Sequence, residues 1–215
     1  MKTWQHISTI AANTLSAVCY PLLIPTYGML LFCWSLTPLV GNSLPFSAWF
    51  VSAGTTFILT ALIPVTAIMI RIRRGKISDI YITRPEQRTV PYLYTAVGFS
   101  FWCYFVICVL RAPLYIDLVA VGATLALFVV MLINFRWKIS AHLTGMGGLI
   151  GGVMSHYLVG PGGPSWLPIV LLAVTLLLMY ARLYVRAHNS MQVVAGFLLG
   201  LAMTLLPNLI MMYVV

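Results

Sequence analysis

Three short segments carry most of the polar side chains that are able to do chemistry. Residues 76–91 read KISDIYITRPEQRTVP, residues 138–145 read KISAHLTG, and residues 181–196 read ARLYVRAHNSMQVVAG. Each holds Lys or Arg, and the last two add His142 and His188. Arg offers a fork of donors that matches phosphate oxygens, and Lys offers a compact positive charge. The pattern predicts a site for an anionic oxyanion such as phosphate.

The two histidines indicate what such a site could do. His142 and His188 each stand where a helix is expected to begin, and free N–H groups at a helix start favour an anion. One histidine can attack phosphorus and form a phospho-histidine, while the other protonates the leaving oxygen. A metal site is disfavoured because two histidines and one or two acids make a thin ligand shell, and nearby cations repel a metal. We expect neither a metal nor a cofactor.

Gln192 has two interpretations. Asn189 and Gln192 match a capping box, in which the side chain of each residue accepts a hydrogen bond from the backbone N–H of the other. Alternatively, Gln192 lies one turn after His188 on the same helical face, and its carbonyl accepts the Nδ1–H of the imidazole. An amide fixes the tautomer in this way, but it does not match a carboxylate in stabilising a cationic imidazole. The residues leave both interpretations open.

The composition is that of a membrane protein. Of the 215 residues, 61% are hydrophobic and 7% are charged, against about 25% charged in a soluble domain. We expect an all-α integral membrane protein with one transmembrane domain, 1–215. Twelve Lys and Arg face three acids, and this excess favours membrane lipids or a phosphorylated substrate as partners, not nucleic acid, because no basic patch alternates with aromatics on a soluble fold.

The apolar runs predict how the chain crosses the bilayer. A membrane helix needs about 20 mainly apolar residues, so we expect a bundle of six to seven transmembrane helices. The seven candidates are 15–36, 47–70, 92–110, 115–134, 139–158, 167–186 and 191–214. Pro21 and Pro25 should kink the first. In the fifth, the pairs Gly147/Gly151 and Gly148/Gly152 should allow close helix approach.

Seven spans would collect the basic residues at one membrane surface. Only Arg111 would lie at the other surface. The first surface would hold Lys2, Arg71, Arg73, Arg74, Lys76, Arg84, Arg88, Arg136, Lys138, Arg182 and Arg186. Both His142 and His188 fall on that side, so the three polar segments should meet. Such an excess of Lys and Arg predicts a cytoplasmic surface.

The order and spacing of the segments resemble the type 2 phosphatidic acid phosphatase superfamily, the integral-membrane lipid phosphate phosphatases. That family carries Lys-x6-Arg-Pro, then Pro-Ser-Gly-His, then Ser-Arg-x5-His-x3-Asp. The third motif reads here Arg182-x5-His188-x3-Gln192, with the Arg-to-His spacing kept and the acid replaced. The second keeps Ser140 and His142 and loses its Pro and Gly.

The first motif is one residue longer than the family pattern. It reads Lys76-x7-Arg84-Pro85, and Arg88 is an alternative for the motif arginine. The resemblance spans about residues 76–196. By resemblance, His188 would be the nucleophile and His142 the general acid. The phosphoryl oxygens would be held by Lys76, Arg84 or Arg88, Arg182 and Ser140.

The resemblance implies a metal-independent phosphatase or phosphotransferase of a lipid phosphate or pyrophosphate. Because Gln192 replaces the orienting acid, the alternative is a weak or inactive relative that binds lipid phosphates or serves in a membrane complex. A transporter is disfavoured, because transporters commonly place ionisable groups at the midplane. The resemblance also implies a multi-pass protein of the bacterial inner membrane whose site faces the periplasm, opposite to the charge rule, and the side stays open.

Overall fold

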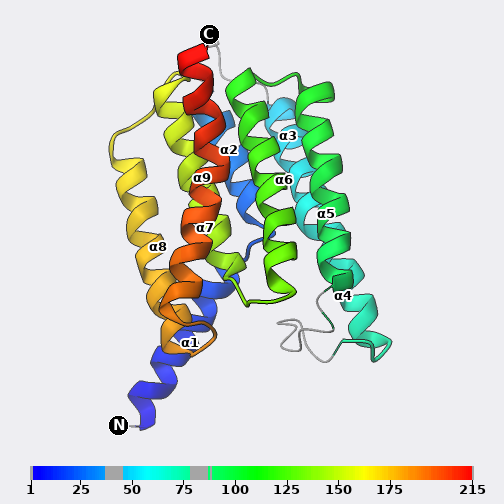
Figure 1. Ribbon diagram of the computed structural model, residues 1–215, viewed down its shortest axis with the longest axis vertical. Coiled ribbons are helices and arrows are strands. Elements are labelled where there is room, and N and C mark those ends of the chain that lie inside the picture. Colours follow the sequence, from blue (N-terminus) through cyan, green and yellow to red (C-terminus); the bar gives the residue numbers. More distant parts are fainter. Residues whose placement is uncertain (1, 37–45, 78–86, 88, 215) are drawn as a thin grey trace.

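The computed structural model describes residues 2–36, 46–77, 87 and 89–214. The structure is 84% helical, and the described residues contain no strand. Figure 1 shows the helices as upright rods with the two chain ends at opposite ends of the bundle. The elements are α1 (Lys2–Val18), α2 (Ile24–Leu36), α3 (Phe46–Phe57), η2 (Ile58–Leu62), α4 (Ile63–Arg73), α5 (Thr89–Tyr104), η4 (Phe105–Leu110), α6 (Leu114–Asn134), α7 (Ala141–Leu158), α8 (Trp166–Tyr184) and α9 (Ser190–Val214).

In the described part of the chain, five helices are long and apolar enough to cross a membrane. They are Ser47–Arg73, Val90–Leu110, Leu114–Asn134, Trp166–Tyr184 and Ser190–Val214. The first of these joins α3 and α4 through the π-helical turn η2, and the second joins α5 to η4. Large apolar side chains cover their outer faces, as Leu172 and Leu176 do on α8. The chain is therefore an all-α, multi-pass membrane protein, and five of the seven predicted spans are confirmed by length and composition.

The predicted count of six to seven spans is not confirmed among the described residues, for two reasons. The candidate 15–36 is divided between α1, which is 17 residues long, and α2, which is 13. The candidate 139–158 forms the single helix α7. However, its glycines and its two histidines make α7 less apolar than the other spans, and it is not among the five.

The break between α1 and α2 confirms that Pro21 and Pro25 disturb the first span. Carbonyl groups freed by such a break need partners, because no water reaches them in lipid. Side chains from elsewhere supply these partners: Tyr27 Oη donates to Val18 O (2.9 Å) and Thr60 Oγ1 donates to Leu22 O (3.1 Å). The irregular segment is thereby held inside the bundle.

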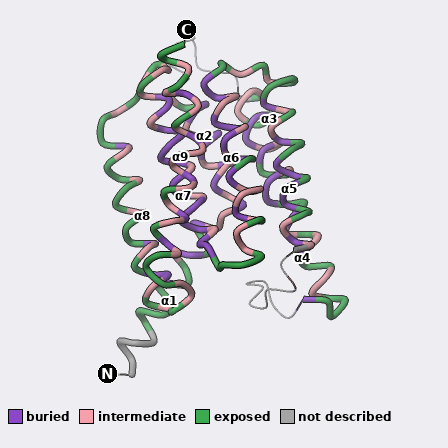
Figure 2. The backbone as a smooth tube through the Cα atoms, in the orientation of Figure 1, coloured by how far each residue is buried: buried purple, intermediate pink, exposed green. Residues whose placement is uncertain are grey.

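Helix α7 lies at the centre of the bundle. Twelve of its 18 residues are buried, and Figure 2 shows buried residues concentrated on the inner helices. Gly147 packs against the backbone of Phe197, and Gly200 of α9 packs against the carbonyl of Thr144. The predicted close approach is therefore confirmed for Gly147, and it fixes α7 against α9.

The described polar turns lie at one end of the bundle, at the bottom of Figure 1. This end holds the end of α4 near 71–77, the turn 134–140 and the turn 185–189, whereas Arg111 lies in the turn at the other end. The predicted common surface is therefore present for the basic residues in these turns. Arg84, Arg88 and the side chain of Lys2 lie outside the described part of the structure.

Replacing Gly200 with Ala should destabilise the protein. The new Cβ would overlap the Thr144 carbonyl oxygen and lie 2.7 Å from Gly148 N, so α7 and α9 would have to separate, at a cost of about 1–3 kcal/mol. The matched control is Gly54→Ala, because nothing lies within 4 Å of a Cβ at Gly54. Thermal unfolding in detergent should show a lower midpoint for Gly200→Ala alone. Equal midpoints for the two variants would contradict the packing of α7 on α9.

Candidate functional site

A polar cavity of about 500 Å³ opens at the charged end of the bundle. Its volume lies in the usual range for small-molecule sites, about 300–1,000 Å³. Polar side chains from six parts of the chain line it: Asn13, Tyr20, Tyr92, Thr95, Asn134, Lys138, His142, Arg182, Arg186 and His188. The second and third polar segments predicted from the sequence therefore meet in one cavity.

The turn between α8 and α9 positions three of these side chains. Arg186 has a left-handed backbone (φ 53°), a conformation that commonly ends a helix. Ala187 N donates to Arg182 O (3.1 Å), which folds the turn back on the last residues of α8. Lys138 Nζ donates to Ala187 O (3.0 Å) and ties this turn to the start of α7. As a result, Lys138, Arg182 and His188 line the same cavity.

Gln192 fulfils both of the roles that the sequence left open. Its Oε1 accepts the Asn189 backbone N–H (3.2 Å), and Asn189 Oδ1 accepts the Gln192 N–H (2.9 Å), which completes a capping box. The same Oε1 lies 3.2 Å from His188 Nδ1. Because an N–H already points at this atom, it must be the acceptor oxygen, so His188 Nδ1 carries the hydrogen. The neutral imidazole then has its lone pair on Nε2.

His142 and Arg182 converge on the last residues of α1. His142 Nε2 lies 3.2 Å from Ser16 O, a carbonyl close to the break after α1. Arg182 Nη1 donates to Ser16 Oγ (3.4 Å). Only 8% of His142 and 9% of Arg182 is exposed. A cation is costly at such a position and usually marks a functional site or a pathway.

His188 is neutral at pH 7 in this environment. Burial, then the positive charges of Arg182 and Lys138, lower the pKa of His188 to about 4. Hydrogen bonding to Gln192 and to the Lys138 backbone acts in the opposite direction and is outweighed. A neutral imidazole with its tautomer fixed, beside several cations, can bind an anionic phosphate and act on it as a nucleophile.

The other predicted site residues either do not line the cavity or lie outside the described residues. Ser140 is fully buried, its hydroxyl has no hydrogen-bond partner in the described structure, and it is not among the residues that line the cavity. Its backbone N–H instead donates to Gln192 O (3.2 Å). Lys76 is exposed beyond the end of α4 and is not in the lining. Arg84 and Arg88 lie outside the described residues.

Sequence reasoning missed several lining residues. The sequence patterns place Lys138 and Arg186 on the charged surface but do not assign them to the site. Asn13 and Asn134 also lie outside the predicted site, although each interrupts a mainly apolar run. A polar residue in such a run commonly faces a protein interior or cavity, so this pattern indicates both residues.

The described lining contains no carboxylate. Asp117, in the first turn of α6, lies towards the end of the bundle opposite to this cavity. Among the described residues, no group of three or more His, Cys, Asp or Glu side chains is placed to hold a metal ion. The described lining instead combines Lys138, Arg182 and Arg186 with two histidines, and such a set of donors suits an anion.

No protein-family model, curated protein or solved structure matches this chain.

His188 should titrate far below the usual range of histidine. Nitrogen-15 NMR of the imidazole should give a midpoint near pH 4, and Lys138→Met should raise it because one of the repelling charges is removed. Since the folded pKa lies below the unfolded value of about 6.5, His188 should cost the protein stability as the pH falls from about 6.5 to 4. A midpoint at or above 6.5 in the wild type would contradict this description of the site.

Proposed function

We propose that the protein is a metal-independent phosphatase or phosphotransferase of lipid phosphates or pyrophosphates at a membrane surface. The observation that carries the proposal is His188, which is neutral and oriented by Gln192 inside a cationic cavity. The resemblance of residues 76–196 to the type 2 phosphatidic acid phosphatases supports it and favours the bacterial inner membrane as the location. The charge rule and the resemblance still favour opposite orientations.

The proposed reaction has two steps. The lone pair of His188 Nε2 attacks phosphorus, and the bond from phosphorus to the lipid oxygen breaks. That oxygen takes a proton from Nδ1 of His142, which in this proposal enters the step protonated at both ring nitrogens. Water then attacks the phospho-histidine, gives a proton back to His142, and releases inorganic phosphate. In a phosphotransferase, the hydroxyl of an acceptor takes the place of water. Gln192 holds Nδ1–H throughout, so Nε2 is the atom that is phosphorylated.

The cations of the cavity bind the phosphoryl oxygens in this proposal. Lys138, Arg182 and Arg186 all belong to the described lining. Groups that stabilise the charge that develops in the transition state commonly contribute more to the rate of an enzyme than any other single effect. The resemblance adds Lys76, Ser140 and either Arg84 or Arg88 to this set.

His142 combines a structural and a proposed chemical role. With Nε2–H on Ser16 O, Nδ1 of a neutral His142 carries a lone pair, so Nδ1 has to take up a proton before it can protonate the leaving oxygen. Its hydrogen bond to a carbonyl near the break of the first span also holds α1 to α7. The two roles separate by substitution, because an Asn or Gln at this position can keep a donor but cannot transfer a proton.

A second candidate is a relative that binds lipid phosphates with little or no turnover. The neutral Gln192 favours it, together with the lack of a carboxylate in the described lining. An amide orients the imidazole but does not stabilise the charge that develops on it. In serine proteases, neutralising the orienting acid lowers kcat by about 10⁴, so a binding protein can arise from this one replacement.

Phosphate release distinguishes an enzyme from a binding protein. Purified protein in detergent or nanodiscs should release phosphate from phosphatidic acid or from a polyprenyl pyrophosphate without added metal, and His188→Ala should abolish the release. His6→Ala, at a histidine outside the three polar segments of the sequence, is the matched control and should keep full activity. Full activity of His188→Ala would refute the assigned nucleophile.

Gln192→Glu should raise turnover. Glu has the same length, so its carboxylate can keep the bonds to Asn189 N–H and His188 Nδ1–H while stabilising the imidazolium. The gain in kcat should approach about 10⁴ if the missing charge is the only defect. Gln192→Asp, the residue of the family motif, should gain less because it is one methylene shorter than the observed contacts require. Unchanged turnover in both, with lipid phosphate still bound, would favour the binding protein.

A further inference from the structure

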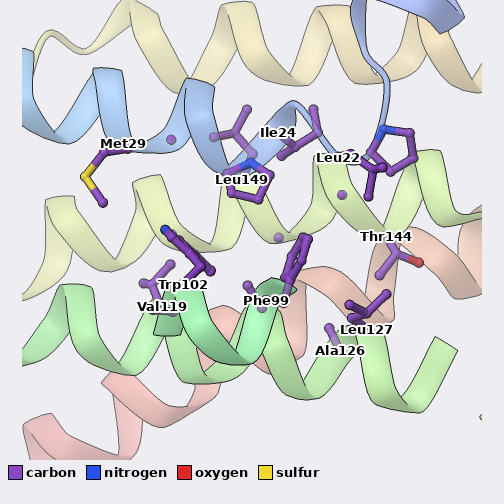
Figure 3. Close-up of a pocket in the computed structure, with 18 of the residues that line it drawn as sticks. Leu22, Ile24, Met29, Phe99, Trp102, Val119, Ala126, Leu127, Thr144 and Leu149 are labelled. Carbon is purple, nitrogen blue, oxygen red and sulfur yellow. The ribbon is translucent and has the colours of Figure 1, made fainter. Parts of the chain in front are cut away.

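A second, apolar cavity lies inside the bundle behind the polar one. It encloses about 110 Å³ between α2, α5, α6 and α7, and Figure 3 shows Met29, Phe99, Trp102 and Leu149 around it. The polar groups at its wall are satisfied within the protein. Thr144 Oγ1 donates to Ser140 O (3.0 Å) and Trp102 Nε1 donates to Thr56 Oγ1 (3.1 Å). An occupant therefore finds an apolar surface only.

The two cavities adjoin. Pro21, Leu22, Leu127 and Ala141 line both of them. Two of these residues belong to the break between α1 and α2, and Ala141 precedes His142 at the start of α7. The polar and the apolar cavity thus meet at these four residues, and a molecule that extends from one cavity into the other would pass between them.

The apolar cavity has a lining that extends along α7 over a length similar to the thickness of one membrane leaflet. On α7 it is lined by a single face, from Ala141 through Thr144, Gly145, Gly148 and Leu149 to Gly152. Eleven residues of helix rise about 16 Å, and half of the hydrocarbon core is about 15 Å. A hydrocarbon chain attached to a phosphate at the charged end would reach the same depth in the bilayer.

The apolar cavity is also narrow. A Cβ at Gly145 would lie 3.1 Å from Ile24 Cγ1, and one at Gly152 would lie 3.0 Å from Val119 Cγ1. Its volume is below the roughly 150 Å³ of an engineered cavity that binds benzene. This space admits part of one slender chain and excludes a second.

We propose that the apolar cavity receives one hydrocarbon chain of the phosphorylated lipid whose phosphate lies in the polar cavity. This inference rests on the proposed function for the location of the phosphate, but it concerns binding and does not depend on turnover. Any second chain of the lipid stays in the bilayer. The protein would then select its substrate by one chain as well as by its phosphate.

The test is a chain-length series of n-alkylphosphonates, from ethyl to decyl, measured by calorimetry on the full chain. These probes are not hydrolysed. Kd should fall by up to about fourfold for each added methylene, the value for full burial of a CH₂ group, and then level off when the cavity is filled. n-Octanol, which lacks the phosphonate, should bind far more weakly than octylphosphonate.

Two substitutions on α6 should reduce, in a defined order, the alkyl-chain length at which Kd stops falling. Ala123 and Ala120 both line the apolar cavity, and Ala120 is the farther of the two from Leu127, which borders the polar cavity. Leu at either position fills part of the cavity. Kd should therefore level off at the shortest alkyl chain in Ala123→Leu, at a longer chain in Ala120→Leu, and at the longest chain in the wild type. Ala173→Leu, on the exposed face of α8, is the matched control and should behave as the wild type. Thermal unfolding verifies that each variant is folded.

The outcomes separate this inference from the proposed function. The proposed binding of a hydrocarbon chain in the apolar cavity would be overturned if Kd were independent of chain length. It would also be overturned if Ala123→Leu and Ala120→Leu left the dependence of Kd on chain length unchanged, even if the protein releases phosphate. Octanol that binds as tightly as octylphosphonate would overturn the link between the two cavities. Chain-dependent binding in a protein without turnover would leave this inference standing and refute the phosphatase.

Discussion

The structure depends on the hydrogen bonds that side chains make, away from water, with the backbone carbonyls at the break between α1 and α2. Tyr27, Thr60 and His142 contact carbonyls of the break or of the last turn of α1. Each comes from a different helix, so α1, α2, η2 and α7 are fixed to one another at this point. The same irregular segment forms the boundary between the polar and the apolar cavity. Non-helical backbone at membrane depth is tolerated where it is buried or lines a cavity, and here it does both.

The charged end of the bundle follows from this arrangement. The short contact of α7 with α9, made possible by glycines, brings the turn 134–140 next to the turn 185–189. The positive charges of Arg182 and Lys138 then lie near His188, and burial together with these charges keeps the imidazole neutral. The chemistry that we propose therefore rests on an environment that favours an anion and a neutral nucleophile together.

Much of this could be predicted from the sequence, because lipid restricts the chain to helices and its polar residues are few. The common charged surface, the disturbance at Pro21 and a close helix approach at Gly147 follow from local patterns, whereas α9 as the partner of Gly147 is known only from the structure. Gln192 could not be assigned to one role, because a single oxygen serves as cap and as histidine partner. The cavities could not be predicted either, since they depend on where α1 leaves the bundle. Lys76 lies apart from the described cavity, and the described residues do not include Arg84 or Arg88.

The most direct test of the central claim is to trap the phosphorylated enzyme. Rapid quenching during turnover of ³²P-labelled lipid phosphate, followed by peptide mapping at alkaline pH, should find acid-labile phosphate on His188, and on its Nε2 because Nδ1–H is held by Gln192. The His188→Asn variant should carry no label. Turnover without a labelled histidine, or label that persists in His188→Asn, would contradict the account.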